Sequence, residues 1–435
     1  MHANLSLQQS PPFSVPARFL ISAPLFSVVA AVIMLWYGPE MIEHRWTPEL
    51  LAVTHFLTLG FLAMSMLGAL MQLMPVLMGI VIPHAVFFSR LIHLPLMLGA
   101  ACLGLAWLSN IKSLFLTAMI LLGFAFSIFI IIAIERLSRS INRHVTRSMM
   151  LLALIALSVT ITLGIYLVMG YTWPDFPVAR HLTDLHLSWG LLAWAGILIM
   201  AVAYQVIPMF QITDNYPAIH QRWMGWLVFT TIIILSLAYY WQLEILKSFC
   251  TIILSCCFLI FSLTTLHVLK TRRRQIPDLT MNFWRLAMLS LASLTAIWVI
   301  SILLDFNPPT LLSGILIIHG FAITSVNGMM YKIFPFLIWL HLSTRNKDLR
   351  DNNKRDLQVK VPHMRKIIPE SVGLWQFRLH LISLVFLILT TLWVEWFYYP
   401  AALLFLMAQA LLFFNLMKAA NFYHVTHTEL NRIQS

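Results

Sequence analysis

The sequence predicts an all-α integral membrane protein of about twelve transmembrane helices, arranged as three pseudo-repeats of four. Three observations predict this class: the composition, the length of the apolar runs and the placement of the basic residues. Hydrophobic residues make up 60% of the 435 residues and charged residues only 10%. An ordinary soluble domain is about 45–50% apolar and about 25% charged. Because a soluble protein needs a polar surface, this composition indicates that lipid covers much of the chain.

The net charge of +12 is explained better by a membrane than by nucleic acid. The basic residues lie mainly in loops between apolar runs, where anionic lipid headgroups attract them. The four cysteines lie in apolar segments without metal-type spacing, and we interpret them as packing residues: Cys102, Cys250, Cys256 and Cys257. The partner that these features indicate is the lipid bilayer, and no nucleic acid.

Apolar runs of about twenty residues mark the spans, since that length of helix crosses the hydrocarbon core. The first six are expected near Phe19–Tyr37, Leu50–Leu77, Leu91–Leu108, Leu114–Ile134, Met149–Gly170 and His186–Val206. The second six are expected near Gly225–Trp241, Phe249–Leu269, Leu286–Leu304, Leu311–Leu340, His380–Tyr398 and Ala401–Met417. Trp and Tyr gather at several span ends, as is typical of membrane interfaces.

The placement of Lys and Arg predicts that both termini are cytoplasmic. With the N-terminus inside, the outside loops hold only Arg45, Lys112, Arg180 and Lys247, and Lys332 lies within a span. The other basic residues all fall inside, which is the bias that sets membrane topology. The predicted organisation is a cytoplasmic tail (1–18), a transmembrane domain (19–420) and a second cytoplasmic tail (421–435). The transmembrane domain divides into repeat units of about 19–140, 149–272 and 285–420, with a cytoplasmic loop at about 341–378.

The second, sixth and tenth spans resemble one another. Each has a histidine near its outer end, and these histidines, His55, His186 and His319, recur about 130 residues apart. Each span also has a polar residue three positions before a proline: Gln72 and Pro75, Gln205 and Pro208, and Lys332 and Pro335. We therefore interpret the chain as three parallel units of four helices. A six-plus-six transporter would divide differently.

The three histidines are the candidate chemistry. An ionisable side chain inside a span is costly and indicates function by default, and imidazole binds heme iron and copper. The alternative is that each histidine only donates a hydrogen bond to a neighbouring helix. Methionines crowd the second span, and thioethers suit Cu(I), but their spacing gives no single face and favours packing.

Twelve helices in three units of four, with His55, His186 and His319 on the second, sixth and tenth, resemble subunit I of the heme-copper oxidases. The chain also resembles the NnrS family of heme- and copper-containing membrane proteins linked to nitric oxide stress. The resemblance implies a location in the bacterial inner membrane. It also implies that His55 and His319 are the axial pair of a low-spin heme b, and that His186 is a copper ligand.

The departures from these families limit what the resemblance implies. The oxidases have a second histidine in helix ten and adjacent histidines in helix seven, whereas His319 is followed by Gly320 and Phe321 and the run Gly225–Trp241 has none. The chain has Tyr398-Tyr399-Pro400 where the oxidases carry an Arg pair for the heme propionates, and Arg45 and Arg180 are the available substitutes. The NnrS pattern of a paired His with a Glu at the start of helix two is also absent, since this chain has Thr54-His55-Phe56 there. One heme or one metal, without oxygen reduction, is what the residues support.

Two functions in different classes follow. The first is a heme-binding, copper-associated membrane protein acting in electron transfer, the nitric oxide stress response or oxidase assembly, with respiratory-chain or oxidase-assembly proteins as partners. The second is a membrane transporter for a metal or small solute that uses the histidines as its permeation site. The threefold repeat and the lack of an evident broken helix favour the first.

Overall fold

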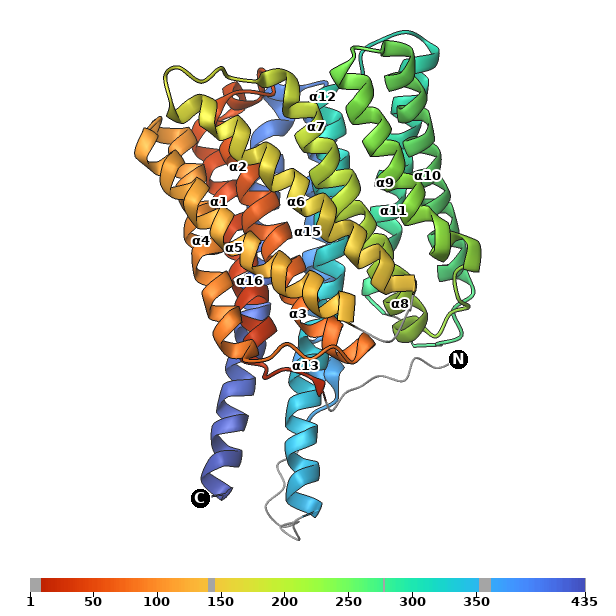
Figure 1. Cartoon of the computed structure of the whole chain (residues 1–435). Helices are drawn as coiled ribbons and strands as arrows, with labels where there is room; N and C mark the ends of the chain where they lie inside the picture. Colours follow the sequence, from red (N-terminus) through yellow and green to blue (C-terminus); the bar gives the residue numbers. More distant parts are fainter. Residues whose placement is uncertain (1–8, 140–144, 277, 352–360, 435) are drawn as a thin grey trace.

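The computed structural model describes residues 9–139, 145–276, 278–351 and 361–434, which form helices and no strand (Figure 1). Twelve helical segments within these ranges are long and apolar enough to cross a membrane. The prediction of an all-α polytopic membrane protein is therefore confirmed.

Nine of the spans are single helices: α1 (Ser14–Tyr37), α4 (Ala85–Ser109), α5 (Lys112–Arg139), α6 (Val145–Thr172), α9 (Ala218–Tyr240), α10 (Glu244–Lys270), α11 (Thr280–Leu303), α15 (Glu370–Thr390) and α16 (Val394–Gln434). The other three are composite, with a π-helical segment between two α-helices. The first is α2 (Pro48–His55), η3 (Phe56–Ala63) and α3 (Met64–Met78), and the second is α7 (Thr183–Leu187), η5 (Ser188–Gly196) and α8 (Ile197–Gln211). The third is α12 (Thr310–Gly314), η6 (Ile315–Ile323) and α13 (Thr324–Asp351). Short helices η2 (Pro39–Ile42), η4 (Arg180–Leu182) and α14 (Met364–Ile367) lie between spans.

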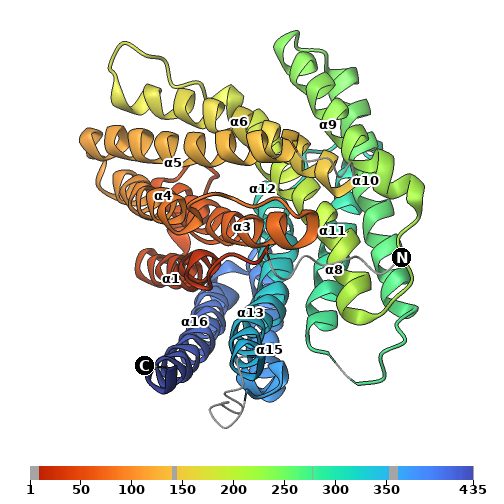
Figure 2. The same cartoon turned by 60° about the horizontal axis from the view of Figure 1, so that its bottom comes forward.

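The nine single-helix spans pack around the other three as a ring of three groups, and Figure 2 shows these groups obliquely, with the bottom of Figure 1 turned forward. Helix α5 packs against α6, and α10 packs against α11, so each group is joined to the next through helices that are consecutive along the chain. Helix α16 packs against α1 and closes the ring. The three groups therefore lie within residues 14–139, 145–270 and 280–434, in the same order as the predicted repeat units.

The three composite spans, which are the spans with the repeated sequence, lie at the centre. Their most apolar stretches are 67%, 78% and 61% buried, whereas no other span exceeds 50%. Segments η3 and η5 both contact η6, so the interior of the protein is built where the three spans meet. The other spans face lipid with large apolar side chains such as Ile131, Leu263 and Leu303.

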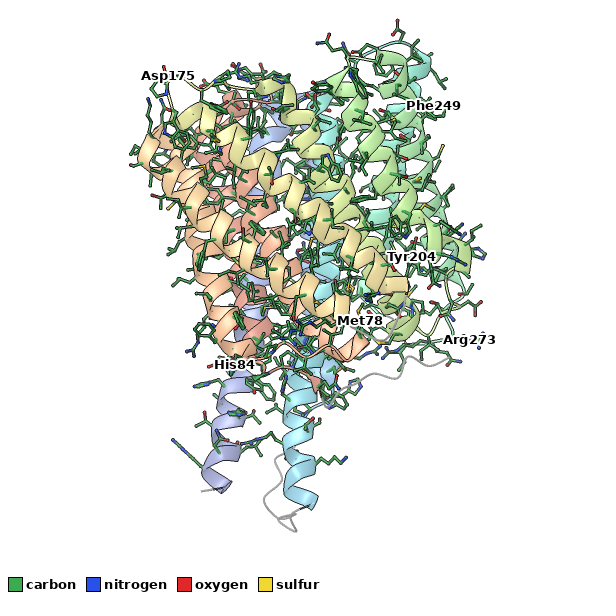
Figure 3. The ribbon with its side chains drawn as sticks, in the orientation of Figure 1. Met78, His84, Asp175, Tyr204, Phe249 and Arg273 are labelled. Carbon is green, nitrogen blue, oxygen red and sulfur yellow. The ribbon has the colours of Figure 1, made fainter. Side chains whose placement is uncertain are left out.

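The loops divide between two ends of the molecule (Figure 3). His84, after the second span, and Arg273, after the eighth, lie at one end, whereas Asp175 and Phe249 lie at the other. We call the end with His84 and Arg273 the basic end, since the basic loops lie there, and the end with Asp175 the opposite end. Which of them faces the cytoplasm stays a prediction.

The predicted boundary of the eleventh span is wrong. That span was expected at 380–398, but α15 covers Glu370–Thr390 and α16 begins at Val394. Within the predicted loop at 341–378, α13 continues to Asp351, and residues 352–360 lie outside the described part of the chain. Gln376 and His380 are polar but wholly buried against other helices, so a count of apolar residues missed the start of this span.

Candidate functional site

Each repeated histidine is next to, or inside, a π-helical segment. His55 directly precedes η3, His186 lies two residues before η5, and His319 lies within η6. A π-helical turn is rare in proteins and is found often at functional sites, because it changes the direction of the side chains around it. Because the π-helical segment recurs beside a histidine in all three composite spans, we take the region around His55, His186 and His319 as the candidate site.

His55 is held in one orientation by its own helix. Its Nδ1 donates to the carbonyl oxygen of Leu51 at 2.7 Å, and its ring stacks on Trp107 of α4 with 6.4 Å between the ring centroids. A carbonyl oxygen can only accept, so the proton of the neutral ring is assigned to Nδ1. The lone pair then lies on Nε2, which is the arrangement found in histidine ligands whose other nitrogen donates to a carbonyl.

His186 has the same arrangement. Its Nδ1 donates to the carbonyl oxygen of Thr160 on α6 at 3.1 Å, which again leaves the lone pair on Nε2. Helix α6 comes this close because Gly164 faces the ring: a Cβ built there would lie 3.0 Å from Cε1 of His186.

His319 is paired with a histidine that the sequence reasoning missed. Its ring is buried and stacks on His380 of α15, with 4.3 Å between centroids and 11° between planes. Phe405 of α16 meets the same ring at 4.9 Å. His380 was expected at the cytoplasmic end of its span, but it lies in the interior of α15, so that expectation is wrong. The apolar residues between Val372 and Leu379 were the signal that the span begins earlier.

Two ring nitrogens of this pair have no hydrogen-bond partner. The hydroxyl of Thr324 donates to the carbonyl oxygen of His319 at 2.8 Å and lies 2.7 Å from Nε2 of His380. Since the hydroxyl has one proton, Nε2 of His380 donates to it, and the lone pair of His380 lies on Nδ1. That Nδ1 and the Nε2 of His319 are both buried and unpartnered. Unpartnered buried polar atoms are costly, and such atoms in a native site call for a ligand or a functional role.

Two arginines lie together at the opposite end of the molecule, the end where the composite spans begin. Arg45 forms an ion pair with Asp184 on α7, two residues before His186. The guanidinium groups of Arg45 and Arg180 both lie over the ring of Trp46, at 4.9 and 5.8 Å from its centroid. The two cations named as substitutes for the oxidase Arg pair are thus close in space, although Arg45 already has a carboxylate partner.

The structure brings His319 and His380 into contact. In the part of the chain that the structure describes, no hydrogen bond or ring contact joins His55 to His186 or to His319. Within the described residues, no three His, Cys, Asp or Glu side chains are close enough together to hold one metal ion. In this conformation, therefore, His55, His186 and His319 do not surround a single metal site.

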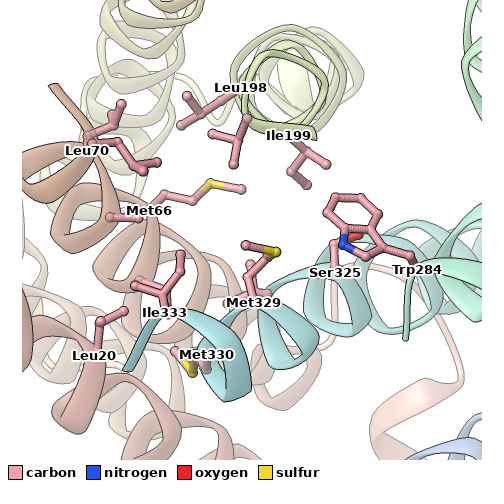
Figure 4. Close-up of a pocket in the computed structure, with 15 residues that line it drawn as sticks. Leu20, Met66, Leu70, Leu198, Ile199, Trp284, Ser325, Met329, Met330 and Ile333 are labelled. Carbon is pink, nitrogen blue, oxygen red and sulfur yellow. The ribbon is translucent and has the colours of Figure 1, made fainter. Parts of the chain in front are cut away.

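A cavity lies deeper along the same three spans (Figure 4). It has a volume of about 70 Å³ and is lined mainly by apolar side chains of α3, α8 and α13, among them Met66, Ile199 and Met329. The methionines of the second span, Met64, Met66, Met71, Met74 and Met78, are all buried, in agreement with a packing role. The hydroxyl of Ser325 at this cavity has no partner.

No protein-family model matches the chain, and no curated protein is similar to it. The family resemblance drawn from the sequence stays a prediction.

Proposed function

We propose that the chain is a heme-binding membrane protein that transfers electrons, with His55 and His319 as the axial ligands of one heme b. The observation that carries the proposal is the buried, unpartnered Nε2 of His319, on a π-helical segment that contacts the one next to His55. Nitric oxide handling and oxidase assembly are the related roles that the resemblance implies.

The chemistry of the donor atoms fits iron. Heme iron takes neutral imidazole nitrogen, and burial disfavours the charged form of a histidine. Nδ1 of His55 is occupied by the Leu51 carbonyl, so Nε2 is the nitrogen left for a metal. A heme supplies a one-electron carrier, and the side chains of this protein orient it and exclude water.

The surroundings support the same assignment. Trp107, Phe405 and the His380 ring flank the two proposed ligands and provide apolar, flat surfaces. Arg45 and Arg180 provide positive charge at the end where the spans of His55 and His319 begin, which suits propionate groups. His186 is the proposed copper ligand, with Nε2 as the nitrogen left for the ion because Nδ1 donates to the Thr160 carbonyl oxygen.

A second candidate is a transporter for a metal or small solute. The apolar cavity between α3, α8 and α13 favours it, because a permeation site is expected where repeated units meet. Its lining of Met66, Met329 and Leu198 fits an apolar solute or a soft metal better than a polar one.

The deciding experiment is the visible absorption spectrum of protein purified after heme-sufficient expression. We expect a low-spin heme spectrum that is abolished by His55→Ala and by His319→Ala and spared by His186→Ala. Gel filtration of each variant checks that the loss is not unfolding. If the purified wild type lacks heme, or if His55→Ala leaves the spectrum unchanged, these histidines act through hydrogen bonds, and solute uptake in vesicles becomes the assay to pursue.

A further inference from the structure

A hollow lined by both charged and apolar residues lies at the basic end, between the first turns of α11 and α15. It has a volume of about 380 Å³, and its lining includes Arg272 from the preceding loop, Arg285 from α11, and Glu370 and Ser371 from α15. A smaller hollow of about 60 Å³ shares Asp278, Leu279 and Glu370 with it. The two are neighbours, and together they form one site, which we call the basic pocket.

Positive charge dominates the basic pocket. Its lining includes five cations, Arg272, Arg274, Arg285, Lys332 and Arg365, and two carboxylates, Asp278 and Glu370. Lys332 donates to Asp278 at 2.6 Å, so one carboxylate is already neutralised. Partial burial, opposed by Asp278, and the nearby charges of Arg274, Arg365 and Arg285 lower the pKa of the Arg272 guanidinium. The arginines thus repel one another, and an anion between them would relieve that repulsion.

One donor in the pocket is unused. The Nη2 of Arg272 donates to the carbonyl oxygen of Ile276, but its Nε is buried without a hydrogen-bond partner. Guanidinium groups bind phosphate oxygens through two parallel N–H donors, and arginine is therefore preferred where planar anions are recognised. Two arginines, Arg272 and Arg285, line the larger hollow of the basic pocket.

The outer wall of the pocket continues into a lipid-facing surface. Leu289 lies one turn deeper than Arg285 on the same face of α11, and Trp375 lies one turn deeper than Ser371 on α15; both are exposed. Arg378 lies 5.0 Å over the ring of Trp375, as is typical of a residue pair at a membrane interface. A ligand with a phosphate at the arginines and hydrocarbon along Leu289 and Trp375 would match both parts.

We propose that the basic pocket binds the phosphate of an anionic phospholipid, with Arg272 and Arg285 holding the headgroup and the acyl chains lying along α11 and α15. Basic pockets between membrane helices bind anionic headgroups in this way. The proposal is independent of the heme assignment, since the pocket and the histidines lie toward different ends of the bundle.

The test uses the full chain, purified in a neutral detergent, with dioleoyl phosphatidylglycerol or dioleoyl phosphatidylcholine added. Melting followed by tryptophan fluorescence gives an apparent Kd for each lipid. We expect phosphatidylglycerol, but not phosphatidylcholine, to raise Tm. Each arginine near an anionic headgroup is worth about fivefold in affinity, so Arg272→Gln/Arg285→Gln should weaken binding by about 30-fold.

Arg273→Gln is the matched control. Arg273 adjoins Arg272 in sequence, but its side chain is 76% exposed, pairs with Asp214 and does not line the pocket. It should leave the affinity unchanged, and Arg285→Lys should recover part of the loss. Equal losses for Arg273→Gln and Arg285→Gln would show general surface attraction and overturn the proposal. Stabilisation by inorganic phosphate without any by phosphatidylglycerol would overturn the lipid assignment as well.

Discussion

Lys332 shows how a single charged residue is accommodated in a span. Its Nζ lies 2.6 Å from Oδ2 of Asp278, and the two side chains are only 13% and 7% exposed. The hydroxyl and backbone N–H of Thr280 also donate to Asp278, at 2.6 and 3.0 Å. The ion pair therefore fixes the tenth span to the loop before α11.

Breaking this pair from one side should be costly. Lys332→Met removes the close cation of the buried Asp278 carboxylate and leaves Arg274, at 3.9 Å, as its remaining ion-pair partner. Loss of one partner from a buried ion pair destabilises a protein by about 3–5 kcal/mol. Thermal melting of the purified protein should show a large fall in Tm. Arg273→Met removes a cation from an exposed pair with Asp214 and should cost under about 1 kcal/mol. Similar falls for both variants would contradict the role given to Lys332.

Acid provides a second readout of the same pair. Burial raises the pKa of Asp278, but the Lys332 ammonium and the hydrogen bonds from Lys332 and Thr280 outweigh burial and lower the pKa to about 2, from 3.8. A carboxyl with a lowered folded-state pKa stabilises fully above its unfolded value and loses that contribution as pH falls through the folded value. The melting temperature should therefore fall between about pH 4 and pH 2. In Asp278→Asn this part of the acid dependence should be missing.

At the scale of the helix, the composite spans depend on close approach at glycine. Gly320 follows His319 in η6, and a Cβ there would lie 2.7 Å from both Cβ and Oγ of Ser290 on α11. Helix α11 can thus pack directly against the π-helical segment that carries His319.

Gly320→Ala should therefore destabilise the protein by about 1–3 kcal/mol, the usual cost of overpacking a well-packed interior. Gly314 in α12 is the matched control, because a Cβ there meets nothing within 4 Å. Gly314→Ala should leave Tm unchanged or raise it, since alanine favours helix over glycine by up to about 1 kcal/mol. A neutral Gly320→Ala would mean that η6 and α11 are looser than this packing implies.

At the scale of the whole molecule, the bundle of twelve spans in the described residues has its basic loops at one end. Both the end of α16 and the loop after α10 lie at that end, and positive loops stay in the cytoplasm. Reporter fusions at Ser435 and within the loop at 270–285 should both report cytoplasm. A periplasmic signal from either fusion would reverse the proposed orientation.

The sequence was sufficient for the number of spans and for the identity of the central ones, because apolar length and repetition are both visible in it. It did not reveal the stacking of His319 on His380, since that contact joins residues from different spans. The π-helical segments have no compositional signature either, and the buried polar residues Gln376 and His380 hid the start of α15. These features depend on contacts between helices that are distant in the sequence. Such contacts allow polar residues and π-helical turns inside a span, where local sequence preference alone would not predict them.

Helix α16 is longer than a membrane span requires. It has 41 residues, whereas about 20 residues cross the hydrocarbon core, so about 30 Å of helix continues into the aqueous phase. The end of α13 projects beside it, and Arg345 donates to Asn431 at 2.6 Å between the two (Figure 1). Two helices that support each other in this way project rigidly from the membrane surface, whereas a flexible loop can fold back onto the bilayer. A fluorescent label near Asn431 should therefore lie at one fixed distance from the bilayer surface. A protein that binds the ends of α13 and α16 would be held away from the lipid headgroups.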